Sequence, residues 1–384
     1  MANVTIDRGG PMAADTGQGF VYDGRLGEIY GIFIKNLLLG IITLGFYRFW
    51  GKTNLRRYIW SHVSLQGDRF EYTGTGGELF KGFLIVFGFF FLASIIKAAI
   101  ELGGGPGSPQ ATLSNFVFAF LIFYLIFVAH YSAQRYRLTR TSWRGVRGGM
   151  TGSAWLWGIK AMFLTVLAGL TLWLAGPWVQ MRLIDDRLNN SYFGDAKAAI
   201  HSSSKPLYLA FLLGILLFIV GTAAVIAVIG GVMGANGTIA QISDMLSSTA
   251  DPAARQAQIE EIFARNIWLI IFAYLAMVVL SLIAFAQYYV ATAREIAGKL
   301  TMSELRFGTT ITVGRYINRM FWNIVIIILT AGLGLPVALH RTIRFLERNI
   351  QIYGQIDGSK ITQSNLPRPK FGEGLLEAFD PGII

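Results

Sequence analysis

Residues 41–50 read Ile-Ile-Thr-Leu-Gly-Phe-Tyr-Arg-Phe-Trp, an apolar stretch that is interrupted by Thr-Leu-Gly and followed by an arginine. This stretch ends an apolar run whose length is close to the ~20 residues that a helix needs to cross a ~30 Å hydrocarbon layer. Seven such runs occur in the chain: Ile29–Trp50, Leu79–Ile100, Leu113–Ala133, Ala154–Trp178, Leu207–Met233, Ile267–Ala291 and Phe321–Leu339. The pattern predicts an integral membrane protein with several apolar segments.

The composition supports this prediction. Of the 384 residues, 53% are hydrophobic and 14% are charged, whereas about 25% are charged in an ordinary soluble domain. The formal net charge of +11 comes from short basic clusters beside the apolar runs. Such clusters are typical of cytoplasmic flanks that face anionic lipid headgroups. We therefore expect membrane lipids as partners, and no nucleic acid, because no basic domain lies outside the apolar runs.

The Thr-Leu-Gly pattern recurs at Thr171-Leu172-Trp173 and Thr330-Ala331-Gly332. Subtracting 171 from 330 gives 159, and the same offset relates several other identical residues. These pairs are Arg135/Arg294, Arg147/Arg306, Gly149/Gly308, Pro177/Pro336 and Arg182/Arg341. Identical residues on one ungapped diagonal predict an internal duplication.

A third, shortened copy of this pattern opens the chain. Asn36 lies seven residues before Thr43, as Asn323 lies seven before Thr330. The stretch at 20–24, Phe-Val-Tyr-Asp-Gly, is echoed at 70–74 by Phe-Glu-Tyr-Thr-Gly, and such alternating aromatics bounded by glycine predict short surface strands. The predicted organisation is a flexible N-terminus at 1–19, a truncated copy at 20–78, a second copy at 79–203, a third at 204–362 and a cytoplasmic tail at 363–384.

The distribution of charge indicates how the segments cross. Basic residues flank all three Thr-Leu-Gly segments on both sides, for example Arg25 before the first and Arg48 after it. Both ends of each segment should therefore be cytoplasmic, as should both termini. This predicts an all-α polytopic protein of a bacterial inner membrane, with four full crossings and three re-entrant segments. The alternative is that each Thr-Leu-Gly segment is a kinked ordinary crossing, since Gly and Pro are common in transmembrane helices.

Candidate functional residues are those that recur around the predicted breaks. Lys160 and Arg319 lead, because they share the 159 offset and a cation at membrane depth is costly unless it is functional. The alternative for both is that they extend to the cytoplasmic interface, as long cations do. The other candidates are Thr43, Thr171, Thr330, Gly45, Pro177, Pro336, Asn36 and Asn323.

Residues for catalysis or metal binding are not evident. The chain has no cysteine, and its four histidines show no ligand spacing. No carboxylates are paired at helical spacing within an apolar run. We expect no metal, no cofactor and no enzymatic activity.

The first copy resembles a known family. Phe46-Tyr47-Arg48-Phe49-Trp50 after Thr-Leu-Gly, then Arg56-Arg57-Tyr58 and the 67–72 stretch Gly-Asp-Arg-Phe-Glu-Tyr, are similar to the signature of the YjgN-like bacterial inner-membrane proteins. The family's Pro-Trp is Phe49-Trp50 here, although Pro177-Trp178 restores it in the second copy. The family has no known function, so the resemblance implies location and fold.

Two functions remain compatible with these patterns. Repeats with broken helices are how many carriers build their sites, which favours a transporter, channel or lipid-handling protein. The alternative is a structural or assembly protein of the bacterial envelope, because no charge network is conspicuous inside the apolar runs.

Overall fold

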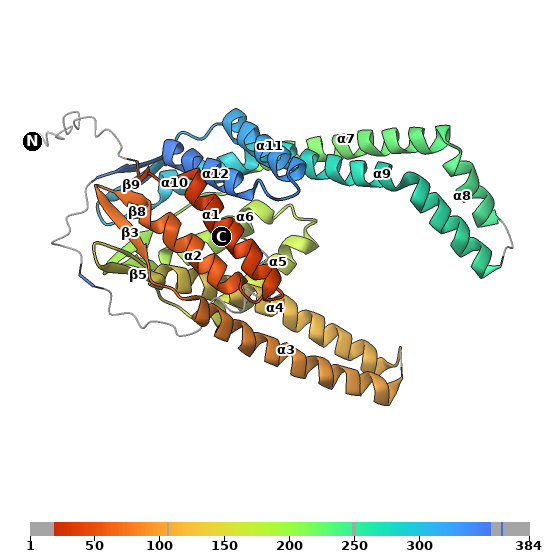
Figure 1. Cartoon of the computed structure of the whole chain (residues 1–384), viewed down its shortest axis with the longest axis horizontal. Coiled ribbons are helices and arrows are strands. Elements are labelled where there is room, and N and C mark those ends of the chain that lie inside the picture. The colour runs from red at the N-terminus through yellow and green to blue at the C-terminus, as the bar shows by residue number, and fades with distance from the viewer. Residues whose placement is uncertain (1–18, 106, 248–250, 355–361, 364–384) are drawn as a thin grey trace, which may run out of the picture. The chain divides into compact units, whose positions relative to one another are not determined.

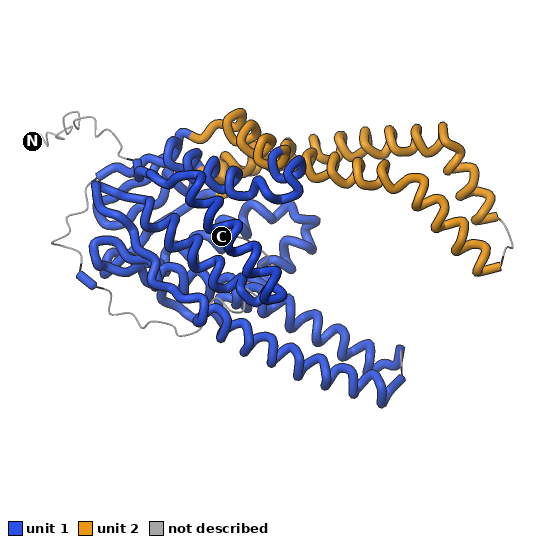
Figure 2. The backbone as a smooth tube through the Cα atoms, viewed as in Figure 1, with its two compact units in different colours: residues 1–203, 294–310, 326–384 blue, residues 204–293, 311–325 orange. Residues whose placement is uncertain are grey.

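The computed structural model describes residues 19–105, 107–247, 251–354 and 362–363, which form helices and one antiparallel sheet (Figure 1). They fall into two compact units (Figure 2). Unit 1 is drawn from residues 1–203, 294–310 and 326–384, and unit 2 from residues 204–293 and 311–325. The predicted flexible N-terminus and cytoplasmic tail lie almost wholly outside the described residues.

Unit 1 contains a ten-stranded antiparallel sheet whose strands are neighbours in chain order. Its strands are two to five residues long. They are β1 Val21–Tyr22, β2 Val63–Leu65, β3 Asp68–Tyr72, β4 Thr141–Trp143, β5 Val146–Met150, β6 Ser191–Phe193, β7 Ala196–Ala199, β8 Thr301–Met302, β9 Leu305–Thr309 and β10 Ile350–Tyr353. The sheet contains both predicted surface strands, as β1 and β3. The sequence predicted an all-α protein with only a few short strands, whereas the structure joins ten strands in one sheet.

The sheet is strongly curved. Leu65 of β2 and Leu305 of β9 belong to one buried cluster, together with Trp143 of β4 and Ile352 of β10. In a flat sheet, β2 and β9 would be about 34 Å apart, because seven intervals of ~4.8 Å separate them. Their side chains meet only because the sheet curls around this cluster.

Five helical excursions leave the sheet and return to it. Each joins two strands that are neighbours in the sheet. In chain order they are α1 Leu26–Ile42 with α2 Arg48–Ser61; α3 Gly76–Gly104 with α4 Pro109–Arg140; α5 Ala154–Leu170 with α6 Gly176–Asn189; α7 Lys205–Ala235 with α8 Thr238–Ser247, α9 Pro252–Ala284 and α10 Ala286–Lys299; and α11 Val313–Leu329 with α12 Leu335–Asn349. Every excursion therefore begins and ends at the same sheet.

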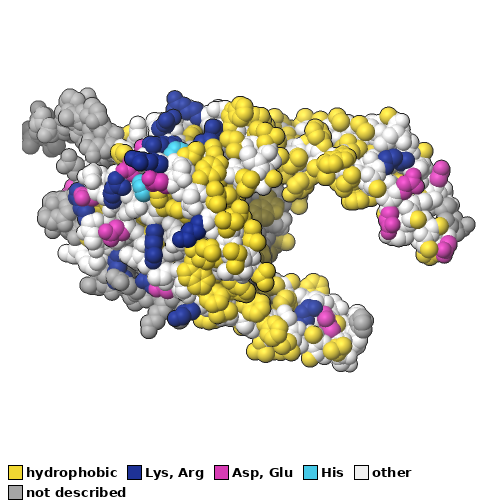
Figure 3. Space-filling view, viewed as in Figure 1, with side chains coloured by type: hydrophobic (Ala, Val, Ile, Leu, Met, Phe, Trp, Pro, Cys, Tyr) yellow, Lys and Arg dark blue, Asp and Glu magenta, His cyan; other side chains and the backbone are white. Residues whose placement is uncertain are grey.

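Among the described residues, four helices are long and apolar enough to cross a membrane: α3, α4, α7 and the nearly continuous helix Pro252–Lys299. Only 6% to 17% of the residues in their apolar windows are buried within the protein, so most of that apolar surface is left for lipid. Hydrophobic side chains cover these helices in the space-filling view (Figure 3). They coincide with the four runs that the charge distribution predicts to cross.

The base of the α3–α4 hairpin is fixed by a half-buried carboxylate. Glu78 forms a capping box with Thr75 at the start of α3. Its oxygens also accept hydrogen bonds from Tyr136 Oη at 2.6 Å and from Arg140 Nη2 at 2.7 Å. Charge-assisted bonds of this kind are short and strong. They hold α3 and α4 together where both leave the sheet.

Candidate functional site

The three predicted breaks are turns with one hydrogen-bond pattern. α1, α5 and α11 each contain 17 residues and end directly before the threonine. The threonine hydroxyl donates to a carbonyl of the helix that ends, and it accepts from the backbone N–H four residues later. The distances to that N–H are 2.9 Å at Thr43, 3.1 Å at Thr171 and 2.7 Å at Thr330. Each threonine thus ends one helix and caps the next.

The other predicted residues of the turns have structural roles as well. Gly45 has a φ of +88°, a left-handed conformation that glycine adopts without strain. Pro177 and Pro336 lie in the first turns of α6 and α12, where a missing N–H costs nothing. Asn36 Nδ2 donates to the carbonyl of Gly51 at 3.1 Å and so joins α1 to α2. Nothing in these contacts assigns them a further function.

The two leading cations lie in different units. Lys160 of α5 is in unit 1, where it forms an ion pair with Asp186 of α6. Arg319 of α11 is in unit 2, with its guanidinium 5.3 Å from the centre of the Tyr316 ring. Asn323, also in unit 2, is buried. A shared role for Lys160 and Arg319 stays a prediction.

A cavity of about 640 Å³ lies in unit 1 between the sheet and helices α2, α4 and α12. Eleven of its sixteen lining residues are apolar. The polar ones are Arg56, Gln134, Arg137, Thr141 and Thr342, and no carboxylate is among them. The apolar ones are Phe20, Ile59, Trp60, Val63, Leu65, Phe70, Leu138, Leu339, Ile343, Leu346 and Ile352. The cavity is therefore apolar with a positive charge on its wall.

The positive charge comes from buried arginine. Arg56 is 1% exposed, and its Nη1 donates to Tyr72 Oη at 3.3 Å. Lys52, one turn earlier on α2, is also buried. We expected the cations of this stretch to face lipid headgroups, but α2 packs between α1, α3 and β3 and turns these two into the protein. Burying a cation is costly unless polar or aromatic partners surround it, and the Tyr72 ring lies 5.8 Å from the Arg56 guanidinium.

A second pair of cations, Arg137 and Arg187, adds to the positive charge near the cavity. Arg137 of α4 lines the cavity. Arg187 of α6 is close enough to Arg137 to be affected by its charge. Burial lowers the pKa of Arg187, and the nearby charge of Arg137 lowers it further. Two nearby like charges repel each other. An anion bound at Arg137 would relieve that repulsion.

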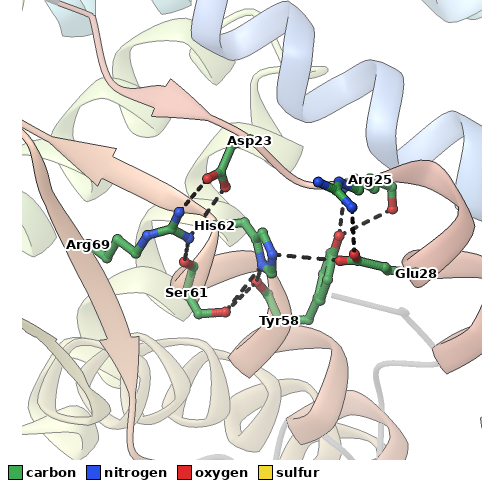
Figure 4. A network of polar contacts seen from close by, with 7 residues as sticks. All are labelled: Asp23, Arg25, Glu28, Tyr58, Ser61, His62 and Arg69. Atoms are coloured by element: carbon green, nitrogen blue, oxygen red, sulfur yellow. Dashed lines mark hydrogen bonds and ion pairs between the residues drawn. The ribbon is translucent and has the colours of Figure 1, made fainter.

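A polar network on the surface of unit 1 places Ser61, His62 and Glu28 in a row (Figure 4). However, His62 Nδ1 lies 2.8 Å from the Tyr58 carbonyl oxygen, which can only accept a hydrogen bond. Nδ1 must therefore carry the proton, and it has no lone pair with which to activate Ser61. Ser61 Oγ itself donates to the same carbonyl at 2.9 Å. The row is a structural contact between α1 and α2.

Nothing in the described part of the chain groups three or more His, Asp or Glu side chains as a metal site would. The cavity was not predictable from the sequence, because its lining comes from segments more than 300 residues apart, such as Phe20 and Ile352. The one available signal was the cluster Arg56-Arg57 on a stretch that also carries aromatic residues.

Four apolar helices and three capped hairpins attached to a curved sheet define a polytopic membrane protein. The comparisons with known proteins then place it: the chain belongs to the family described as "Bacterial protein of unknown function (DUF898)", whose family model matches residues 18–378. This confirms the resemblance that residues 43–72 predict.

Relatives in enteric bacteria carry one name. The chain is 26% identical to "Inner membrane protein YjgN" of Salmonella typhimurium over 385 aligned positions, which cover 90% of this chain and 91% of the relative. It is 36% identical to the protein of the same name from Escherichia coli O157:H7, over 33% of this chain and 30% of the relative. No solved structure matches this chain. The membrane location expected from the composition agrees with these names.

Proposed function

We propose that this inner-membrane protein handles lipids by binding a single-chain anionic amphiphile in the cavity of unit 1. The observation that carries the proposal is the cavity wall, where Arg56 and Arg137 stand among apolar side chains without a carboxylate. Its volume of about 640 Å³ lies within the ~300–1,000 Å³ of ordinary ligand sites. An acyl chain would fill the apolar part, and the arginines would bind its carboxylate or phosphate.

The re-entrant topology is part of this proposal. A strand of an open sheet is not stable in lipid, because its edges expose unpaired backbone groups. All ten strands would then lie on one side of the membrane, and the three short hairpins must return to that side. Their tips are strongly apolar, with Leu44 at 89%, Leu172 at 83% and Leu329 at 81% exposure. Such tips are suited to dip into one leaflet, and the basic flanks favour the cytoplasmic one.

An internal duplication accounts for the likeness of the three hairpins. The same 17-residue helix, the same threonine contacts and the same left-handed pair of residues occur in each. We regard this likeness, together with the 159 offset, as support for three copies of one unit.

Binding can be measured on the purified full chain by native mass spectrometry. Oleate is the probe, and oleyl alcohol, which has the same chain without the charge, is the reference ligand. We expect oleate to be retained at least tenfold better than the alcohol. Arg137→Gln should remove this preference, and Leu346→Trp should reduce binding of both by filling the apolar part.

The matched control is Arg25→Gln, which removes a well-exposed cation from the same unit outside the cavity. Equal retention of oleate and oleyl alcohol by the unmodified chain would refute the proposal. Scrambling and flux assays in liposomes then separate lipid handling from the structural or assembly role, which predicts binding without movement of lipid.

A further inference from the structure

Unit 2 has an apolar groove of its own. Helices α7 and α9 pack side by side, α8 joins them, and a groove of about 530 Å³ runs between all three. Every lining residue except Asn266 is apolar. Along α9 the groove extends from Ile259 to Ala273, which corresponds to about 21 Å of helix.

The length of α7 sets the depth of this groove in the membrane. Met233, which lines it, lies 28 residues beyond Lys205 at the start of α7. This corresponds to about 42 Å along the helix, more than the ~30 Å hydrocarbon layer. The end of the groove beside α8 therefore reaches the headgroup layer opposite the one that holds the start of α7. The Ala273 end lies deeper, among acyl chains.

Polar residues are fixed midway along the groove, where α7 ends and α8 begins. Asn266 is 3% exposed and Thr238 is 0% exposed, and Asn266 Nδ2 donates to Thr238 Oγ1 at 3.2 Å. Arg265 Nη2 also donates to Thr238 Oγ1, at 3.0 Å, and to the side chain of Gln241. The exposed guanidinium is thus held against Thr238, which also bonds the groove-lining Asn266.

Acidic side chains accompany Arg265. Glu261 precedes Arg265 by four residues on α9, and Asp244 follows Gln241 by three on α8, so each shares a helix face with its partner. Asp and Glu side chains also gather around this end of unit 2 in the space-filling view (Figure 3). A purely anionic headgroup would be repelled by these carboxylates. A phosphate joined to an ammonium group matches both signs of charge.

The geometry points to a binding site for a zwitterionic phospholipid of the phosphatidylethanolamine type in the leaflet where α7 ends. One acyl chain lies in the groove between α7 and α9. The phosphate binds Arg265, and the ammonium group lies among the carboxylates of α8 and α9. This inference concerns unit 2 alone and does not depend on the cavity of unit 1.

Native mass spectrometry of the delipidated full chain tests the site through three diacyl probes with identical chains. These are phosphatidylethanolamine, phosphatidylglycerol and diacylglycerol. We expect phosphatidylethanolamine to be retained at least fivefold better than either of the others. Arg265→Gln should reduce its retention to the diacylglycerol value. The matched control is Arg255→Gln, which removes the same charge from the same helix ten residues before Arg265.

Ala273→Phe obstructs the deep end without touching the polar residues, and it should reduce retention of all three probes. Equal retention of the three lipids by the unmodified chain would overturn the inference without any variant. Preference for phosphatidylglycerol would overturn the zwitterionic assignment, and normal binding in Ala273→Phe would show that the chain lies elsewhere.

Discussion

At the residue scale, the packing of two tyrosine rings explains why Tyr-x-Gly occurs at both 22–24 and 72–74. The ring of Tyr22 folds back over Gly24, where an added Cβ would lie 2.3 Å from Tyr22 Oη. The ring of Tyr72 does the same over Gly74, with an added Cβ 2.6 Å from Tyr72 Cε1. Both rings are almost fully buried. The glycines are therefore required by close packing, which the sequence pattern shows but does not explain.

Gly24→Ala and Gly74→Ala should each destabilise the protein by about 1–3 kcal/mol, because a buried ring must move to admit the methyl group. Thermal unfolding in detergent measures the loss. The matched control is Gly77→Ala, where an added Cβ meets nothing within 4 Å. That change should be neutral or slightly stabilising in a helix. Equal effects at positions 74 and 77 would contradict the packing argument.

Tyr22 also gives a pH prediction. Burial raises the pKa of Tyr22 to about 12. A raised folded-state pKa means that this stabilisation is complete below pH 10, the unfolded value, and is lost as pH rises from 10 to 12. The loss should reach about 2 kcal/mol. Tyr22→Phe should lack this part of the alkaline destabilisation, and unfolding curves from pH 9 to 12 would show whether the two proteins diverge.

The hairpin turn is the feature that matters at the element scale. Two consecutive left-handed residues follow each threonine, and the second is Gly45, Trp173 or Gly332. A left-handed residue other than glycine costs about 1–2 kcal/mol. The second hairpin tolerates Trp173 there, so its tip carries strain that the other two avoid.

Gly45→Ala should therefore destabilise the first hairpin by about 1 kcal/mol through the backbone alone, since no atom lies within 4 Å of the added Cβ. Gly40→Ala is the matched control, because it has the same free space in the interior of α1. There the change should favour the helix by a similar amount. Opposite signs in thermal unfolding are expected, and a loss at position 40 as large as at 45 would count against the turn assignment.

The sequence predicts the elements unevenly for physical reasons. The four long helices were predictable, because an apolar run of spanning length has few other solutions. The turns were predictable from Thr, Gly and Pro. The sheet was mostly not, because strands such as β8, Thr301–Met302, are too short to show alternation, and pairs such as β7 with β8 join residues about a hundred positions apart. The cavity was not predictable for the same reason, because strands of this sheet form part of its lining.

At the scale of the whole molecule, the single sheet is the observation that supports the proposed re-entrant topology. Each excursion joins neighbouring strands, so an odd number of crossings within any excursion is excluded if the sheet lies on one face. In the proposed topology the paired helices satisfy this condition, since α3 would cross outward and α4 would return. The kinked-crossing alternative does not, because it would place β5 and β6 on opposite faces although they are hydrogen-bonded.

Single-cysteine labelling tests this directly, because the native chain has no cysteine to react. Exposed positions beside the sheet, Arg144 before the α5–α6 hairpin and Lys197 after it, should react with an impermeant maleimide from the cytoplasmic face only. Gln110 and Gln258, at the far ends of the spanning helices, should react from the periplasmic face. Phe46 at a hairpin tip should react from neither face until detergent removes the lipid. Labelling of positions 144 and 197 from opposite faces would require the second hairpin to cross, and the sheet could not then exist as one structure.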